Sequence, residues 1–217
     1  MKSLVNSKKY KKVLRQVPAN YYAKGVKTNL LQKIWHTNKW SHLEQFLVGI
    51  NGKLLDIGCA DGTTTNQIKK RFAHLEITGV DFYKDALKFA KRSYQQIDFI
   101  HADAHRLPFR RSSFDTVTTI EVLEHMHEIE QVIKEIYRVL KPKGSLIIVQ
   151  DTDSILFKVI WWFWTKWKGS VWTESHISCM KPKKLMHLLR QNGFAIKKYK
   201  FVNLRMEIFI KAQKNQV

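Results

Sequence analysis

The sequence predicts an α/β protein with a mostly parallel sheet and helices on both faces. Two observations support this prediction. Short apolar segments of strand length alternate with longer segments in which apolar residues recur at helical spacing. The first of these strands leads into "LLDIGCADG", an acidic, glycine-bearing turn that is followed by a helix. A strand, a glycine turn and a helix in this order are typical of open sheets that bind ligands beyond the carboxyl ends of their strands.

No linker or internal repeat divides the chain, so we expect one domain over residues 1–217. Because little chain separates the last two strands, we expect a hairpin that makes the last strand antiparallel to its neighbours. The expected parts are a basic helical arm (1–50), a ligand-binding core (51–150), an aromatic insertion (151–180) and a closing helix and hairpin (181–217). Expected helices are 30–48, 63–72, 84–93, 128–140 and 182–192, and expected strands are 53–57, 75–80, 97–101, 114–120, 145–150, 195–201 and 206–211.

The positive charge of the chain lies mainly in its two ends. There are 38 lysine and arginine residues against 18 acidic ones, a net charge of +20. The net charge is +9 over residues 1–50, +2 over 51–150 and +9 over 151–217. This distribution either serves solubility or indicates an anionic partner such as nucleic acid, a lipid surface or a phosphorylated substrate.

The sequence predicts a cytoplasmic protein. No apolar segment typical of a signal peptide follows the first residues. The longest apolar cluster, 155–164, is interrupted by Lys158 and is too short to span a bilayer. Two cysteines, Cys59 and Cys179, are too few for a disulfide framework.

Three acids lie at or beside the ends of the first three expected strands: Asp56, Asp81 and Asp103. Asp81 lies about twenty residues beyond the glycine turn, where a carboxylate suits the two hydroxyls of a ribose. Asp103, in "HADAH", offers an acceptor to an exocyclic amine such as that of adenine. The turn "GCADG" lacks the G-x-G-x-x-G spacing that admits a pyrophosphate. A cationic nucleoside therefore fits these residues better than a polyphosphate.

Four segments resemble, in order, the motifs of class I S-adenosylmethionine-dependent methyltransferases, especially the branch of ubiquinone and menaquinone biosynthesis. "LLDIGCADG" resembles the first motif and "ITGVDFYKDAL" the ribose motif. "FIHADAHRLPFRRSSFDTVTTIEVLEHM" resembles the adenine motif and fourth strand, and "IKEIYRVLKPKGSLIIV" the following helix and fifth strand. The resemblance is specific over roughly residues 50–150 and looser beyond. It implies a Rossmann-like, seven-stranded sheet with the last strand antiparallel, S-adenosylmethionine as methyl donor and S-adenosylhomocysteine as product.

The resemblance also assigns cofactor-binding residues. The first motif would face the methionine part, Asp81 would hold the ribose, and Asp103 would accept a hydrogen bond from the adenine amine. Family members often have glycine where this chain has Ala60, so we expect adjusted packing there and retained binding. The residues implied at the cofactor are Asp56, Gly58, Cys59, Ala60, Gly62, Asp81, Phe82, Asp103, Ala104, Glu121 and Val122.

Two histidine pairs, His101 with His105 and His125 with His127, raise the question of a metal site. Their spacing does not favour one, because the first pair straddles a strand end and the second would point apart on a helix. No metal is expected. The resemblance places His125 at the methyl-transfer end, where it would orient the acceptor or take its proton. A capping or buried structural role for His125 stays open.

Residues 155–172 contain five of the seven tryptophans. At about 100° per residue, one helical face would carry Leu156, Val159, Ile160, Phe163, Trp164 and Trp167, with Trp161 and Trp162 near the polar side. A core helix accounts for the apolar face, but the extra tryptophans and lysines are typical of a helix at a membrane interface. Because the resemblance places the acceptor pocket here, we expect a mobile aromatic cover, with Trp161 and Trp162 near the acceptor and membrane contact open.

The acceptor is expected to be a small, apolar or anionic molecule. Tyr22 and Trp35 are expected on a helix that crosses the pocket, and Asp151 either binds the acceptor or caps the next turn. One alternative is an RNA-modifying enzyme, which the charge of +20 favours, although the chain shows no appended RNA-binding module. Another is a cofactor-binding or membrane-associated protein without transfer activity, against which the intact acids argue. The acceptor atom and the oligomeric state are left unassigned.

Overall fold

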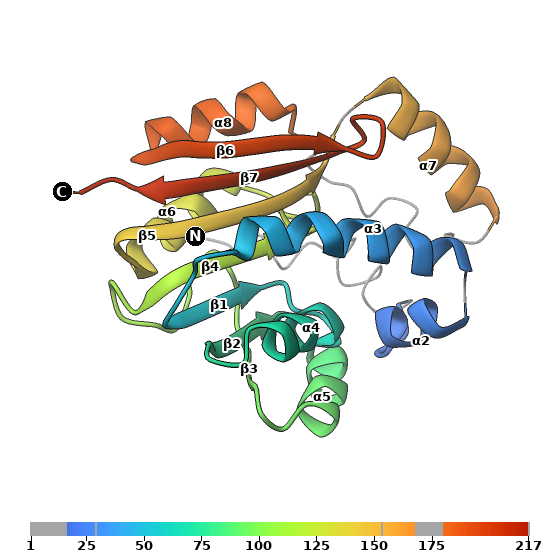
Figure 1. The fold of residues 1–217 in the computed structure, drawn as a ribbon, viewed down its shortest axis with the longest axis horizontal. Coiled ribbons are helices and arrows are strands. Elements are labelled where there is room, and N and C mark those ends of the chain that lie inside the picture. Colours follow the sequence, from blue (N-terminus) through green and yellow to red (C-terminus); the bar gives the residue numbers. More distant parts are fainter. Residues whose placement is uncertain (1–16, 29, 153, 168–179, 217) are drawn as a thin grey trace.

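A seven-stranded sheet forms the centre of the structure (Figure 1), a computed structural model that describes residues 17–28, 30–152, 154–167 and 180–216. The strand order is β3-β2-β1-β4-β5-β7-β6. Strands β1 to β5 run parallel, and β7 is antiparallel to both of its neighbours, β5 and β6. The predicted α/β class with an antiparallel last strand is thereby confirmed. The strands are β1 (Lys53–Ile57), β2 (Glu76–Asp81), β3 (Asp98–His101), β4 (Phe114–Ile120), β5 (Leu140–Asp151), β6 (Phe194–Val202) and β7 (Glu207–Lys214).

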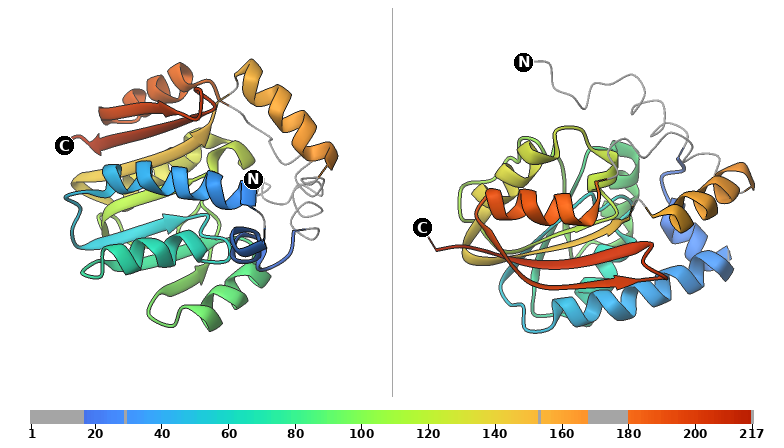
Figure 2. Two further views of the ribbon diagram at one scale, coloured as in Figure 1. Left: turned by 45° about the vertical axis from the view of Figure 1, so that its right-hand side comes forward. Right: turned by 90° about the horizontal axis from the view of Figure 1, so that it is seen from above.

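Helices cover both faces of the sheet, as the two views of Figure 2 show. One face is covered by α3 (Leu30–Leu47), α4 (Thr63–Arg71) and α5 (Lys84–Ser93). The other face is covered by α6 (Ile129–Val139) and α8 (Pro182–Gln191). Strands that are buried on both faces need apolar residues at successive positions, which explains why the central strands show apolar runs and no alternation.

The two buried clusters divide the strand residues by their alternating direction. Leu54 packs in the cluster beneath α3, whereas its neighbour Leu55 packs in the cluster beneath α6. In β5, Ile147 and Val149 belong to the first cluster, and the residues beside them belong to the second. Each strand thus joins two separate cores, and the sheet is held from both sides.

The carboxyl ends of the parallel strands meet at one edge of the sheet. Because β7 is antiparallel, its first residue lies at this edge too, and Asp151 pairs with Glu207 in the β5–β7 register. Three further segments gather there: α2 (Tyr21–Thr28), the short 3-10 turn η2 (Leu123–His125) and α7 (Ile155–Trp167). Polar groups from distant parts of the chain are therefore concentrated in one place.

The structure differs from the expected elements at two points. The N-terminal arm contains two helices, α2 and α3, where one was predicted. Strand β5 begins at Leu140 and not at residue 145, because the buried Leu140 pairs with Phe114 ahead of an irregularity in the β4–β5 register. Residues 142–144, which lie between the expected helix and strand, thus belong to a longer strand.

The larger apolar face that helical spacing predicts for α7 is not its buried side. Phe157 is buried, whereas Leu156, Val159 and Phe163 are 40%, 48% and 63% exposed. The helix lies beyond the sheet edge and packs through the narrow side that carries Phe157 and Trp161, whose rings stack 5.6 Å apart. Residues 168–172 of the aromatic segment, Asp153 and Cys179 lie outside the described residues. Within the described part of the chain, no helix has the length and apolar character needed to cross a bilayer.

We predict that Phe46→Ala lowers the free energy of unfolding by about 3–5 kcal/mol, because a fully buried ring is lost and leaves a cavity. The Phe46 ring packs 5.6 Å from that of Phe209 and joins α3 to β7. Chemical denaturation measures the change. Val48→Ala, at a position 64% exposed, is the control and should be nearly neutral; an equal loss in both variants would contradict the role of Phe46.

Candidate active site

Asp56, the residue before the last of β1, joins three elements at the floor of the site. One carboxylate oxygen accepts a hydrogen bond from the Thr118 hydroxyl of β4 at 2.7 Å, and the other accepts one from the Thr65 hydroxyl of α4 at 2.6 Å. Burial raises the pKa of Asp56 to about 6, against the opposing effect of both hydroxyls. Asp56 therefore fixes the start of the glycine turn as well as bordering the site.

The turn from Gly58 to Gly62 takes left-handed backbone at three positions. Gly58 and Gly62 both have φ of 76°, and Ala60 has φ of 47°. A Cβ at Gly58 would lie 2.3 Å from Val122, so the close approach to the segment after β4 requires glycine. Ala60 holds a conformation that disfavours a side chain. The Ala60 N–H donates to Asp81 at 2.8 Å, which offsets this local cost.

Asp81 ends β2 and holds the glycine turn from the other side. Its two carboxylate oxygens accept hydrogen bonds from the backbone N–H groups of Ala60 (2.8 Å) and Tyr83 (2.7 Å). Burial raises its pKa, against these two hydrogen bonds. Each oxygen keeps a second lone pair, so the carboxylate still fits a pair of ribose hydroxyls.

Asp103 follows β3 and is oriented by a histidine. The backbone N–H of His105 donates to Asp103 at 2.9 Å, and His105 Nδ1 lies 2.7 Å from the same oxygen. His105 Nε2 lies 2.8 Å from the His127 carbonyl oxygen, which ties this loop to the segment after β4. Nearby, the rings of Phe82 and His101 lie 5.3 Å apart and form an aromatic wall.

These residues border two small hollows that meet at Gly58, which together we call the cofactor cleft. One hollow has the acids, apolar side chains and aromatic ring that suit an adenosine. The other lies along the glycine turn and reaches Glu121. The hydrogen-bonding groups of the cofactor cleft therefore fit S-adenosylmethionine. The lining residues include Asp81, Phe82, Asp103, Ala104, Val122 and His125 in the first hollow and Tyr22, Asp56, Cys59, Ala60 and Glu121 in the second.

A larger cavity of about 460 Å³ adjoins this cleft, and we call it the acceptor cavity. It shares Glu121, Tyr22, His36 and Lys39 with the hollow along the glycine turn, and His125 with the adenosine hollow. Its walls come from α2, α3 and α7 and are mostly aromatic or apolar. The wall residues are Tyr21, Tyr22, Ile34, Trp35, Phe157, Ile160, Trp161 and Met206.

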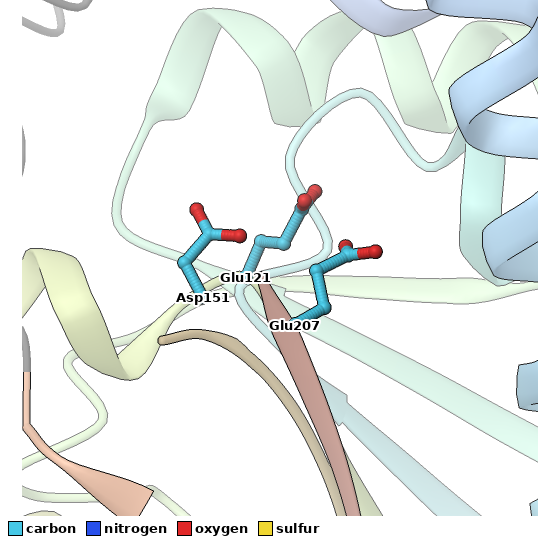
Figure 3. Close-up of side chains that lie close together, drawn as sticks. All are labelled: Glu121, Asp151 and Glu207. Atoms are coloured by element: carbon cyan, nitrogen blue, oxygen red, sulfur yellow. The ribbon is translucent and has the colours of Figure 1, made fainter. Parts of the chain in front are cut away.

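A buried ion-pair cluster lies between the two spaces. Glu121, Asp151 and Glu207 come from the ends of β4, β5 and β7, and Figure 3 shows their carboxyl groups close together. Lys39 of α3 is 4% exposed and forms ion pairs with Glu121 and, at 3.5 Å, with Glu207. Three carboxylates placed this close together could also bind a metal ion. Here the Lys39 ammonium supplies positive charge to two of the three.

The cluster shifts the protonation of its members. Burial alone would lower the pKa of Lys39, but the charges of Glu121 and Glu207 outweigh burial and raise it. Burial would raise the pKa of Glu121, but the charge of Lys39 lowers it below the usual range. Burial raises the pKa of Glu207 to about 7 and that of the neighbouring Glu124 to about 8. Lys39 and Glu121 are thus charged near neutral pH, and Glu124 is mostly protonated.

The N-terminal segment closes over the glycine turn. The Ala23 N–H in the first turn of α2 donates to Asp61 at 2.8 Å, and the Tyr83 hydroxyl donates to the Val17 carbonyl at 2.7 Å. This position brings Tyr22 to the junction of the cofactor cleft and the acceptor cavity. Burial raises the pKa of Tyr22 further above its usual value, so its hydroxyl stays protonated.

The structure brings together most of the residues predicted from sequence. All the predicted cofactor residues except Gly62 line the cofactor cleft, and Gly62 turns the chain into α4. Of the predicted acceptor residues, Tyr22, Trp35, Asp151 and Trp161 line the acceptor cavity. Trp162 is not among the residues lining it, is 52% exposed and packs against Phe163.

Three residues were missed by the sequence interpretation: Lys39, Glu124 and Glu207. Glu124 lies within the segment "EVLEHM", which was interpreted for its histidine, so a signal was present. Lys39 and Glu207 had none, because each is a single charged residue whose partners lie far away in the sequence.

Comparison with known proteins agrees with this geometry. Residues 55–148 match the methyltransferase domain family. A demethylmenaquinone methyltransferase of Thermotoga maritima is 27% identical over 177 residues, which cover 73% of this chain and 77% of that protein. The ubiquinone/menaquinone biosynthesis C-methyltransferase UbiE of Desulfotalea psychrophila is 32% identical over 103 residues, 46% of this chain and 42% of that protein. The chain spans 51–52% of the length of further demethylmenaquinone methyltransferases.

Solved structures share the fold. The PH0226 protein of Pyrococcus horikoshii has a TM-score of 0.70 at 20% identity and covers 86% of this chain and 93% of its own. A phosphoethanolamine N-methyltransferase of Haemonchus contortus, solved with S-adenosylmethionine, has a TM-score of 0.66 at 19% identity over 83% of this chain and 53% of its own.

The fold, the acids at three successive strand ends and the domain match together define a class I S-adenosylmethionine-dependent methyltransferase. S-adenosylmethionine is the methyl donor of this class. Within it, the chain is similar to the demethylmenaquinone methyltransferases.

We predict that Asp81→Ala weakens S-adenosylmethionine binding by about tenfold or more, because the ribose loses a charged acceptor and the Ala60 N–H loses its partner. Calorimetry measures the affinity. Asp98→Ala, at the exposed start of β3, is the control and should bind normally. Unchanged binding in Asp81→Ala would remove this aspartate from the cofactor site.

We predict that Lys39→Met destabilises the fold by about 3–5 kcal/mol at pH 8, because Glu121 and Glu207 are left as buried carboxylates without a counter-ion. Without Lys39 the folded-state pKa values of these acids rise above their unfolded values. Stability is then lost as pH rises through the folded-state pKa values and is partly regained on lowering the pH toward 5. Urea unfolding at several pH values measures this; Lys88→Met, in an exposed ion pair, should show no such dependence.

Proposed function

We propose that this methyltransferase transfers the donor methyl group to a small, largely apolar molecule held in the acceptor cavity. The observation that carries the proposal is the continuity of the two spaces, because Glu121 and His125 border both the cofactor cleft and the acceptor cavity. A molecule in the cavity would lie next to the methionine end of the donor.

The proposed catalysis rests on proximity and orientation. S-adenosylmethionine supplies an activated methyl group, which passes to the acceptor by in-line displacement. Asp81 and Asp103 hold the nucleoside, and the turn from Gly58 to Gly62 leaves room for the methionine part. The aromatic walls exclude water and fix the acceptor body. His125, which borders both spaces, is proposed to orient the acceptor or to take its proton.

The acceptor class follows from the walls and from the relatives. The relatives include enzymes named for demethylmenaquinone, and an apolar ring system fits walls made by Tyr22, Trp35 and Trp161. Glu121, Glu124 and Asp151 also line the cavity, which disfavours an anionic acceptor. Of the two classes predicted from sequence, we therefore propose the apolar one.

We propose that this protein is cytoplasmic and binds peripherally to a membrane surface. The outward side of α7 carries exposed apolar residues beside the acceptor cavity, and Leu204 in the β6–β7 turn is 79% exposed. Lys166 lies over the Trp162 ring at 4.2 Å, which places an ammonium beside an exposed aromatic residue. Together with the net charge of +20, this side suits a bilayer containing anionic lipids. The exposed residues of α7 include Ile155, Leu156, Val159, Ile160, Trp162 and Phe163.

RNA methylation is the alternative, and the observation that favours it is the net charge. The aromatic, enclosed acceptor cavity favours a small molecule over a polymer. RNA binding that weakens steeply with salt, together with methyl transfer to RNA, would support the alternative.

The proposed function is tested by incubating the protein with methyl-labelled S-adenosylmethionine and a bacterial lipid extract, beside a reduced naphthoquinone and total RNA. Label should appear in the lipid-soluble fraction. Transfer to RNA alone, or to no fraction while the donor still binds, would refute the proposal.

We predict that two adjacent tryptophans of α7 have separable effects. Trp161→Ser should lower methyl transfer about tenfold through loss of apolar contact in the acceptor cavity, with little effect on vesicle binding. Trp162→Ser should leave transfer to a water-soluble acceptor unchanged and weaken flotation with anionic vesicles. Equal effects of both substitutions on both measurements would contradict this division of α7.

A further inference from the structure

Four residues border both the acceptor cavity and the hollow along the glycine turn: Tyr22, His36, Lys39 and Glu121. On the proposed function, the methionine end of the donor lies in that hollow, so the methyl group passes between the two substrates at this junction. His125 instead joins the acceptor cavity to the adenosine hollow. A group that orients the acceptor beside the methionine end of the donor is therefore to be sought among these four residues.

Three of the four junction residues are poorly suited to accept a hydrogen bond from a ligand. Lys39 and Glu121 form an ion pair with each other, so the carboxylate is already matched by a positive charge. The Lys39 ammonium has no lone pair. The Tyr22 hydroxyl stays protonated and is a ready donor. His36 is the fourth.

The ring of His36 is positioned by its two neighbours. It lies one helical turn before Lys39 on α3, so both side chains extend from the same side of that helix. The His36 ring meets the Tyr22 ring edge to face, with the ring centres 5.8 Å apart and the planes at 88°. The residue is half-buried, and no described residue forms a hydrogen bond with either nitrogen of its ring.

His36 carries no charge near neutral pH. Burial and the charge of Lys39 lower its pKa to about 4, against the opposing effect of Glu121. A neutral imidazole has one nitrogen that donates a hydrogen bond and one that accepts, whereas an imidazolium only donates. His36 therefore offers a nitrogen lone pair at the junction of the two spaces.

We propose that His36 positions the acceptor: one nitrogen of its ring accepts a hydrogen bond from a hydroxyl group of the acceptor and holds this polar end beside the cofactor cleft. The inference rests on the proposed methyl transfer and adds to it a positioning residue and the polar group that it recognises. A hydroxyl group donates without bringing negative charge toward Glu121. The apolar body of the acceptor then lies against Trp35 and Trp161.

The test compares two ligands of similar shape: 1-naphthol, which has a hydroxyl group, and 1-methylnaphthalene, which has none. Calorimetry is carried out with saturating S-adenosylhomocysteine, which fills the cofactor cleft. The wild type should bind 1-naphthol about tenfold tighter than 1-methylnaphthalene. His36→Phe keeps a ring against Tyr22 and should bind both ligands equally, with the affinity for 1-methylnaphthalene unchanged. His36→Asn, whose side-chain oxygen accepts hydrogen bonds, should restore part of the preference.

His42→Phe is the matched control. His42 lies on the same helix, its ring packs against Phe209, and it is not among the residues lining the cofactor cleft or the acceptor cavity. This variant should keep the preference of the wild type. Binding of S-adenosylhomocysteine shows that each variant is folded; should His36→Phe fail to fold, His36→Asn and the wild type still give the test.

Three results would overturn the role of His36. The first is a wild type that binds both ligands equally. The second is a His36→Phe or His36→Asn variant that keeps the full preference for 1-naphthol. The third is a His36→Phe variant that weakens both ligands by the same factor, because this would show that the ring serves packing alone.

The proposed function fails separately from this inference. Absence of methyl transfer to every fraction, with S-adenosylmethionine still bound, refutes the transferase role whatever the preference for 1-naphthol. Methyl transfer to the lipid-soluble fraction, together with a full preference for 1-naphthol in His36→Phe, keeps the function and overturns the role of His36.

Discussion

The ion pairs of Lys39 determine how the site can be built. A lysine that is 4% exposed must have carboxylate partners, and Glu121 and Glu207 supply them from two strands that are not neighbours in the sheet. The pairs hold α3 across the carboxyl edge of the sheet. Because Lys39 and Glu121 border both the cofactor cleft and the acceptor cavity, the same contact forms the partition between donor and acceptor. Both the fold and the site thus depend on the buried ion pairs of Lys39 with Glu121 and Glu207.

The aspartates at the strand ends serve structure and ligand together. Asp56 joins β1, β4 and α4 through two threonine hydroxyls, and Asp81 holds the glycine turn through two backbone N–H groups. Each carboxylate is therefore oriented by hydrogen bonds from the protein itself, and such preorganisation limits the ordering that ligand binding requires. Asp103 is fixed in the same way by His105. The cofactor cleft is thus held by hydrogen bonds within the protein.

Most of the fold could be predicted because its signals are local. Strand β1 begins and ends where the apolar run predicts, and the glycine turn, Asp81 and Asp103 follow their strands at fixed distances. The acceptor side depends on contacts between distant segments. Lys39 pairs with Glu207 across more than half the chain, and the β5–β7 register that brings Glu207 beside Asp151 leaves no local pattern. The buried side of α7 could not be predicted for the same reason, because helical periodicity finds the larger apolar face of a helix but not the side that meets protein.

Helix α7 has one side that borders the acceptor cavity and another that is exposed. Phe157 and Trp161 stack inward and close the cavity, while Trp162 and Phe163 pack against each other on the exposed side. An apolar acceptor that leaves a membrane would meet the outer side first and need only pass the helix to reach Glu121. A helix buried in a core could not serve this purpose, because both sides would be covered by protein. On the proposed function, the apolar residues of α7 would serve two separate contacts, one with the bound acceptor and one with the membrane from which it comes.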